Sequence, residues 1–128
     1  MVKIVKVAET PIEPHGIAER ISLVSEEMGA KNFDMFLLTV KPNTPPHTSY
    51  HSHKKQENGF FIMRGKAKMI VEGVEYIAGP MTMIFVSPGE KHQVINIGKS
   101  NLEIMAIHAP VRDEDIPIQD EAYLRRNV

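Results

Sequence analysis

Three histidines and the oxygen-bearing side chains near them are the part of this sequence best suited to chemistry. His51 and His53 are separated by one residue, so on a β-strand both imidazoles point to the same side. Two neutral imidazoles that converge in this way are a common beginning of a metal site. A third imidazole, His92, follows a Pro-Gly turn and begins a later apolar run. If the fold brings that run beside the first, the three rings can share one divalent metal ion.

Short strands separated by turns must position these rings. The chain has nine prolines and eight glycines, and long amphipathic helical patterns are hard to find. Glu72-Gly73 is a plausible two-residue hairpin turn. Regularly spaced short strands predict an all-β, antiparallel sandwich or barrel. The expected strands cover residues 1–7, 17–24, 33–41, 50–53, 60–64, 66–71, 74–77, 83–86, 92–97 and 102–108.

Two segments resemble the two motifs of the cupin superfamily. Residues 51–65 contain the paired histidines, oxygen ligands a few residues later and Gly65, and residues 87–96 contain Gly89, His92 and Asn96 at the spacing of the second motif. The resemblance covers roughly residues 35–110 and implies a small jelly-roll barrel, the double-stranded β-helix. We therefore expect one domain over residues 1–128. Its parts would be N-terminal strands (1–32), a barrel (33–110) and a polar C-terminal tail (111–128), either a short helix or a docking arm.

The fourth metal ligand is open between two neighbouring residues. Counted back from Gly65, the position where cupins usually carry a glutamate is Asn58. Glu57 fits the shorter spacing from His53, but a shift of one residue on a strand reverses the face. Either a bulge turns Glu57 inward, or the amide oxygen of Asn58 coordinates, or only histidines and water bind. With three neutral histidines, a carboxylate would leave a divalent site with a charge of about +1 and an amide about +2.

Other residues are candidates for the cavity around such a metal. Phe60 and Ile62 share strand parity with Asn58 and should line it, and His47 could contact a substrate at its mouth. Glu57 and His108 are the candidate catalytic groups for moving a proton. His15, between Pro14 and Gly16, is expected in a loop. The metal can be iron, manganese, nickel, cobalt, copper or zinc, because all accept imidazole and oxygen ligands.

Composition excludes several classes of function. The net charge is −1, with 15 basic and 16 acidic residues, so we expect neither a nucleic acid nor a membrane surface as partner. The absence of cysteine excludes disulfides and thiolate catalysis. Lysines interrupt the apolar residues of segment 1–7 too soon for a signal peptide, so a cytoplasmic protein is expected. The same segment could pair between subunits, which predicts a homodimer.

Three functions fit these expectations. The first is a metal-dependent enzyme of the dioxygenase type acting on a small molecule, a chemistry that the resemblance to small cupins implies. The second is a metal-dependent isomerase or lyase for a sugar or keto acid, in which the metal polarises a carbonyl and a nearby base moves a proton. The third is a non-catalytic module that binds a small ligand. A fold of this kind does not decide between them.

Overall fold

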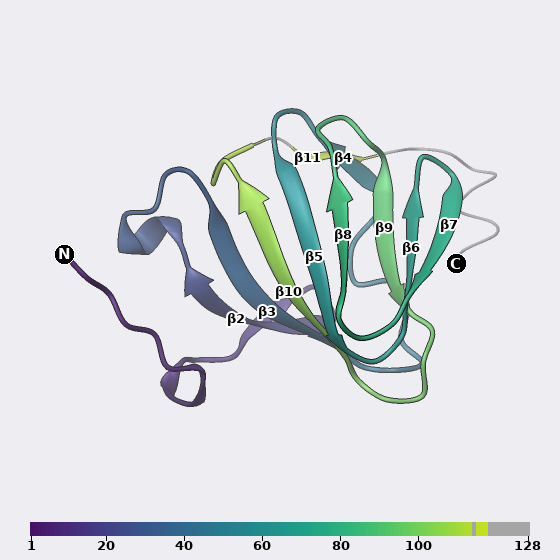
Figure 1. Cartoon of the computed structure of the whole chain (residues 1–128), viewed down its shortest axis with the longest axis horizontal. Coiled ribbons are helices and arrows are strands. Elements are labelled where there is room, and N and C mark those ends of the chain that lie inside the picture. Colours follow the sequence, from purple (N-terminus) through teal and green to yellow (C-terminus); the bar gives the residue numbers. More distant parts are fainter. Residues whose placement is uncertain (114, 118–128) are drawn as a thin grey trace.

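Two antiparallel sheets that face each other make up this protein, as seen in a computed structural model (Figure 1). The structure describes residues 1–113 and 115–117, the last three through their backbone alone. Two short 3-10 turns, η1 (Val7–Glu9) and η2 (Glu26–Met28), accompany the strands. The strands are β1 (Glu13–His15), β2 (Ala18–Val24), β3 (Asp34–Val40), β4 (His51–His53), β5 (Glu57–Arg64), β6 (Ala67–Val71), β7 (Val74–Ala78), β8 (Thr82–Val86), β9 (His92–Asn96), β10 (Leu102–Ala109) and β11 (Asp115–Pro117).

The order of the strands places distant parts of the chain side by side. The six-stranded sheet has the order β1-β2-β3-β10-β5-β8, and the five-stranded sheet has the order β11-β4-β9-β6-β7. Every pairing between these strands is antiparallel. The expected all-β antiparallel class is confirmed. The strands that carry the first and second histidine motifs, β4 and β9, are direct neighbours.

The hydrophobic core lies between the two sheets because alternate residues of each strand point inward. Leu38 on β3, Ile62 on β5 and Ile104 on β10 expose 2% or less of their surface, and Met69 on β6 is fully buried opposite them. Burying a side chain of this size contributes about 1.5–3 kcal/mol relative to leaving it exposed. This packing holds the inner faces rigidly and leaves one end of the space between the sheets for the site.

Two turns explain why particular residues are required. Glu72 and Gly73 both have positive φ, 50° and 78°, which is the pattern of a type I′ hairpin turn between β6 and β7. Gly65 has φ +91°, and an added Cβ would lie 2.7 Å from the carbonyl oxygen of Asn101. Only glycine fits there, because the chain leaves β5 against the strand that pairs with it.

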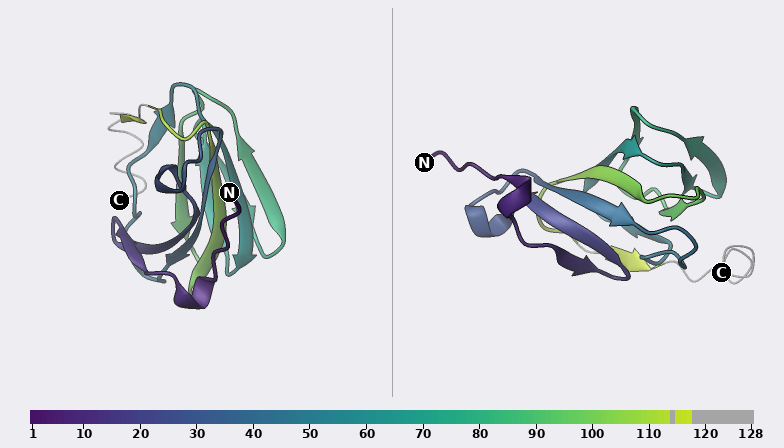
Figure 2. Two further views of the ribbon diagram at one scale, coloured as in Figure 1. Left: turned by 90° about the vertical axis from the view of Figure 1, so that its left-hand side faces the viewer. Right: turned by 90° about the horizontal axis from the view of Figure 1, so that it is seen from below.

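The N-terminal end of the chain differs from the sequence-based expectation, and the tail decides between two alternatives. Residues 1–7 do not form a strand; they run beyond the sheets on one side (Figures 1 and 2). In the tail, β11 pairs with β4, which fits the docking arm and not the helix of the two expected alternatives, and residues 118–128 lie outside the described region. No helix among the described residues is long and apolar enough to cross a bilayer.

Candidate metal centre

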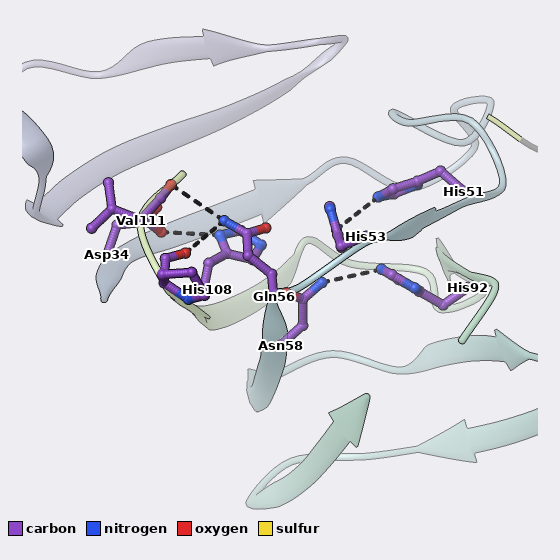
Figure 3. Close-up of polar contacts among 9 residues, drawn as sticks. Asp34, His51, His53, Gln56, Asn58, His92, His108 and Val111 are labelled. Atoms are coloured by element: carbon purple, nitrogen blue, oxygen red, sulfur yellow. Dashed lines mark hydrogen bonds and ion pairs between the residues drawn. The ribbon is translucent and has the colours of Figure 1, made fainter. Parts of the chain in front are cut away.

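His51, His53 and His92 converge on one point, and we call them the metal trio. His51 on β4 lies directly opposite His92 on β9, and His53 follows on the same face of β4. The ring centroids are 4.6 Å apart for His51 and His92, 4.8 Å for His51 and His53, and 5.2 Å for His53 and His92. Each ring offers a nitrogen within 4.8 Å of the other two (Figure 3). The predicted meeting of the two motifs is therefore present in the structure.

Backbone carbonyls determine which ring nitrogens can bind a cation. The Nδ1 of His51 donates to the carbonyl oxygen of Ser49 over 2.6 Å, and the Nδ1 of His92 donates to that of Glu90 over 2.9 Å. A carbonyl only accepts hydrogen bonds, so in the neutral form of either ring the lone pair lies on Nε2. In proteins, histidines that bind metals are commonly oriented in this way, by a hydrogen bond from the ring nitrogen that does not bind the ion.

The spacing of the nitrogens also fits one ion. The Nε2 atoms of His51 and His53 are 3.2 Å apart. Two imidazole nitrogens about 2.1 Å from one ion, at about a right angle, would be about 3.0 Å apart. Burial lowers the pKa of His92 to about 4, and the neighbouring histidines lower it while the bond to Glu90 opposes the shift. His92 is thus neutral near pH 7, the form that binds a metal.

Asn58, and not Glu57, faces the metal trio. The pairing of β5 with β10 keeps one register from Glu57 to Ile62, so no bulge there turns Glu57 inward. Glu57 is exposed, whereas Asn58 is 1% exposed and its Nδ2 lies 3.2 Å from Nε2 of His92. The Oδ1 of Asn58 is buried without a hydrogen-bond partner among the described residues. A half-turn of the amide would exchange the two atoms and direct this oxygen at the trio.

These observations test whether the residues present suit a metal ion. Three converging imidazoles and a buried amide oxygen form a nitrogen and oxygen donor set of the kind that divalent transition metals accept. The donor set therefore fits such an ion, and the metal trio would hold it. Coordination by Asn58 stays a prediction, and so does the identity of the metal.

A cavity of about 720 Å³ opens at the metal trio and is lined by all six histidines of the chain. Phe60 and His47 line it, in agreement with their sequence parity and position. Ile62 was expected to line the cavity and does not. It lies two residues after Phe60 on the same face of β5, and its side chain is fully buried in the hydrophobic core. Glu57 does not reach it either, so the structure does not bring this predicted catalytic carboxylate to the histidines.

His108 enters the cavity with a carboxylate behind it. Asp34 on β3 is the cross-strand partner of His108 on β10, and its Oδ1 lies 3.0 Å from Nδ1 of His108. The centroids of the His108 and His53 rings are 5.9 Å apart. The carboxylate orients the ring and favours a proton on Nδ1, which leaves Nε2 as the nitrogen that can exchange protons (Figure 3). Sequence parity indicated His108 but not its partner Asp34.

His15 and His47 complete the lining, and we group them with His108 as the wall trio. The expectation that His15 lies in a loop is wrong, since it ends β1 and its ring centroid is 5.6 Å from that of His47. Gly16 makes this approach possible: with φ +62°, an added Cβ would be 2.2 Å from the carbonyl oxygen of His47. Burial, with smaller effects of His15 and His51, lowers the pKa of His47 to about 4.

A segment after β10 packs over the loop that connects His53 to Asn58. The Nε2 of Gln56 donates to the carbonyl oxygens of Pro110 at 2.8 Å and Val111 at 3.2 Å. The carboxylate of Asp113 accepts hydrogen bonds from the backbone N–H groups of Lys55 and Gln56. These contacts fix the turn that connects His53 to Asn58. No local sequence pattern indicated Asp113.

Comparisons with known proteins agree with the architecture. A family profile described as "Cupin domain" matches residues 36–108. The polyketide cyclase RemF from Streptomyces resistomycificus superimposes with a TM-score of 0.75 at 23% identity, over 94% of this chain and 89% of that one. KdgF from Halomonas sp. gives 0.76 at 10% identity, over 88% and 96%. A predicted oxalate decarboxylase from Thermotoga maritima gives 0.73 at 20% identity, over 84% and 99%.

At these identities the structural matches support the jelly-roll fold alone. A comparison with curated proteins finds no match to this chain. The profile covers more than half of the sequence and spans both histidine motifs. The chain belongs to the cupin family.

Proposed function

We propose that this protein is a metal-dependent enzyme that moves a proton on a small carbonyl compound, in an isomerisation, cyclisation or elimination. The observation that carries the proposal is the ion-pair geometry of Asp34 and His108, 3.0 Å apart, beside the metal trio and in the same cavity. A base held by a carboxylate and a cluster of metal-binding imidazoles are the two parts that such a reaction needs.

The metal trio would hold the ion, which when bound supplies a Lewis acid for a substrate carbonyl oxygen. Nε2 of His108 takes the proton from the carbon next to that carbonyl, and the electron pair of the broken C–H bond passes toward the carbonyl group. Asp34 stabilises the imidazolium that results, as a carboxylate does for a catalytic histidine. In an isomerisation, His108 then returns the proton to a different atom of the substrate. In an elimination the enolate expels a hydroxyl group, which takes the proton and leaves as water, and in a cyclisation the enolate carbon bonds to a second carbonyl carbon, whose oxygen takes the proton. None of these consumes an oxidant or a reductant.

The cavity suits a small organic molecule. Its volume of about 720 Å³ lies within the range of about 300–1,000 Å³ found for ligand pockets. Phe36 packs between two polar rings, with centroids 5.3 Å from His15 and 5.4 Å from His108, and Phe60 lies 6.0 Å from His92. Aromatic faces and imidazoles together favour a planar or conjugated substrate with polar groups at its edge. The fold it shares with a polyketide cyclase is consistent with such a substrate.

Oxygen-dependent cleavage is the second candidate function. A donor set of three histidines and at most one neutral amide leaves positions on an iron ion where a substrate and O₂ could bind together. The hydrogen-bonded pair of His108 and Asp34 has no necessary part in that chemistry. For this reason we rank the dioxygenase second, although the sequence alone placed it first.

One experiment separates the two. The protein, loaded with the metal found by elemental analysis, is incubated in D₂O under nitrogen with dihydroxyacetone or 2-oxobutanoate, and deuterium uptake next to the carbonyl is followed by NMR. We expect uptake without O₂, and His108→Gln should slow it by about 10²–10⁴-fold while metal content stays unchanged. Uptake or turnover that requires O₂ would support the dioxygenase. Equal rates for His108→Gln and the unaltered protein would refute the role of His108.

A further inference from the structure

Arg112 carries the one fixed positive charge on the wall of the cavity that contains the metal trio. Among the described residues that line this cavity, it is the only arginine or lysine. Burial lowers the pKa values of His47 and His92 to about 4, so these two rings are neutral near pH 7. The carboxylate of Asp113, which also lines the cavity, already accepts two backbone N–H groups of the loop before β5. The guanidinium of Arg112 is therefore the group of the wall best suited to bind an anion.

A carboxylate of the same chain already binds this guanidinium. Arg112 donates from Nε to Oε1 of Glu26 over 2.6 Å and from Nη2 to the same oxygen. The hydrogen bond from Arg112 lowers the pKa of the Glu26 carboxyl group, which stabilises its ionised form. The contact demonstrates that a carboxylate fits the guanidinium in the position that Arg112 takes at the cavity.

The ion pair of Arg112 and Glu26 is open to solvent. The two side chains are 84% and 46% exposed. Exposed ion pairs contribute little to stability, because water and salt screen them. Lys31, itself exposed, lines a hollow of about 330 Å³ beside the same pair, so a second cation lies near the position where an anion would approach. Another carboxylate can therefore replace Glu26 on Arg112 at little cost.

Strand register places this ion pair at the end of the sheet that carries the proposed base. Glu26 begins η2, two residues after the end of β2, and Arg112 lies three residues beyond β10. Both strands pair with the first residues of β3, where Asp34 is opposite His108. The carbonyl group of the residue before Arg112 accepts a hydrogen bond from Gln56, which ties this segment to the loop between the histidines and β5.

We propose that Arg112 binds a carboxylate of the substrate and that Glu26 occupies its place until the substrate arrives. The inference rests on the proposed function and narrows its substrate class to a small carbonyl compound with a carboxylate several bonds from the carbonyl group. The carbonyl oxygen lies at the metal trio and the carboxylate at Arg112. No covalent step is needed, since one carboxylate leaves the guanidinium as the other takes its place.

Two keto acids of equal chain length test the role of Arg112. 2-Oxoglutarate and 2-oxopentanoate share the keto-acid end, and only 2-oxoglutarate has a second carboxylate at the other end. Isothermal titration calorimetry of the metal-loaded protein at about 0.15 M salt measures both dissociation constants. We expect 2-oxoglutarate to bind about tenfold more tightly or better, and Arg112→Gln to remove this preference. Equal dissociation constants for the unaltered protein, no measurable binding of either acid, or a preference that survives in Arg112→Gln would overturn the proposal.

Glu26→Gln separates competition from a purely structural role of the ion pair. Removal of the competing carboxylate should tighten the binding of 2-oxoglutarate about two- to fivefold and leave that of 2-oxopentanoate unchanged. If the pair only held the wall of the cavity in shape, Glu26→Gln would weaken binding or leave it unaltered, and the role of Glu26 would be refuted.

Arg64 and Glu103 provide matched controls for these two substitutions. They form an ion pair at 3.4 Å with side chains 81% and 40% exposed, and neither residue lines the cavity. Arg64→Gln and Glu103→Gln therefore change the net charge in the same way as the variants at Arg112 and Glu26. Both should leave the two dissociation constants unchanged. A loss of preference in Arg64→Gln would show that net charge, and not Arg112, selects the dicarboxylate, and would overturn the proposal.

Deuterium uptake distinguishes a failure of this inference from a failure of the proposed function. Uptake without O₂ together with equal affinities for the two keto acids would refute the carboxylate site at Arg112 and leave the reaction standing. A preference for 2-oxoglutarate that depends on Arg112, without deuterium uptake into either acid, would leave the binding site standing and refute the reaction.

Discussion

The metal trio and the wall trio consist of the same residue type in one cavity, yet they are held in different ways. In the metal trio, His51 and His92 donate from Nδ1 to backbone carbonyls two residues earlier, so Nε2 is free to bind a cation. In the wall trio, His108 is bound to a carboxylate, and His47 packs against His15. The difference shows that the partner of each ring, more than the ring itself, determines what it can do.

The metal trio could be recognised from the sequence more easily than the wall trio, because of where the residues of each lie along the chain. His51 and His53 obey the two-residue period of a strand, and His92 belongs to a motif with a recognisable turn. His15 and His108 come together because β1 and β10 belong to one sheet, and His47 joins them from the loop between β3 and β4. Contacts of this kind depend on strand order, which local patterns do not determine.

Metal binding should separate the two trios most sharply. We expect His51→Ala with His92→Ala to weaken binding by on the order of a thousandfold or more, because two of three imidazole ligands are lost. His15→Gln with His47→Gln should leave the affinity within about threefold, since neither ring is among the three that converge. Elemental analysis and competition with a chromophoric chelator measure both, on protein purified without an affinity tag.

One result would contradict the assignment of metal binding to the metal trio alone. If the pair His15→Gln and His47→Gln lost metal as fully as the pair His51→Ala and His92→Ala, all six rings would have to be regarded as one site. Circular dichroism of each metal-free variant provides the control for folding.

Much of the fold could be predicted from the sequence, and the reasons are local. Alternating apolar residues predicted β3, β6 and β10 within about a residue at each end, and Glu72-Gly73 predicted its hairpin. The metal trio followed from strand parity and motif spacing. The pairing of Asp34 with His108 could not be predicted, because 74 residues separate them and register alone brings them together. The sequence also could not show that Ile62 lies in the core and not in the cavity wall. That depends on how far the hydrophobic core extends between the sheets.

The metal-free protein should become less stable in acid because two buried histidines resist protonation, His92 of the metal trio and His47 of the wall trio. The pKa values of His47 and His92 fall from 6.5 to about 4 on folding. Above pH 6.5 both rings are neutral in either state. Between pH 6.5 and 4 the unfolded chain binds more protons, so the free energy of unfolding decreases as the pH falls, by up to about 3 kcal/mol for each ring.

Urea unfolding at pH 7 and pH 4.5 measures this loss. In His47→Gln, the decrease in the free energy of unfolding that is due to these two histidines should be about half as large. Glutamine does not titrate, so only His92 contributes to it. Carboxylates that titrate in the same range are common to both proteins and cancel in the difference. An identical loss for the variant and the unaltered protein would show that His47 is not buried as a neutral ring.

Substitutions at Asn58 should change the metal affinity of the site. The expected change is smaller than the effects described for metal binding and for acid stability. Asn58→Asp keeps the size of the side chain and replaces a neutral donor by a carboxylate, which lowers the net charge of the bound site from about +2 to about +1. We expect zinc to bind about tenfold more tightly to Asn58→Asp, and about tenfold more weakly to Asn58→Leu, which has no donor.

The two variants must move in opposite directions if the amide oxygen coordinates. Without metal, Asn58→Asp places a carboxyl group at a position that is 1% exposed, so its thermal stability should fall and should recover when zinc is added. Asn58→Leu should show neither change. If both variants bound zinc as the unaltered protein does, the donor set would consist of the three imidazoles and water. The unpaired Oδ1 of Asn58 would then need another explanation.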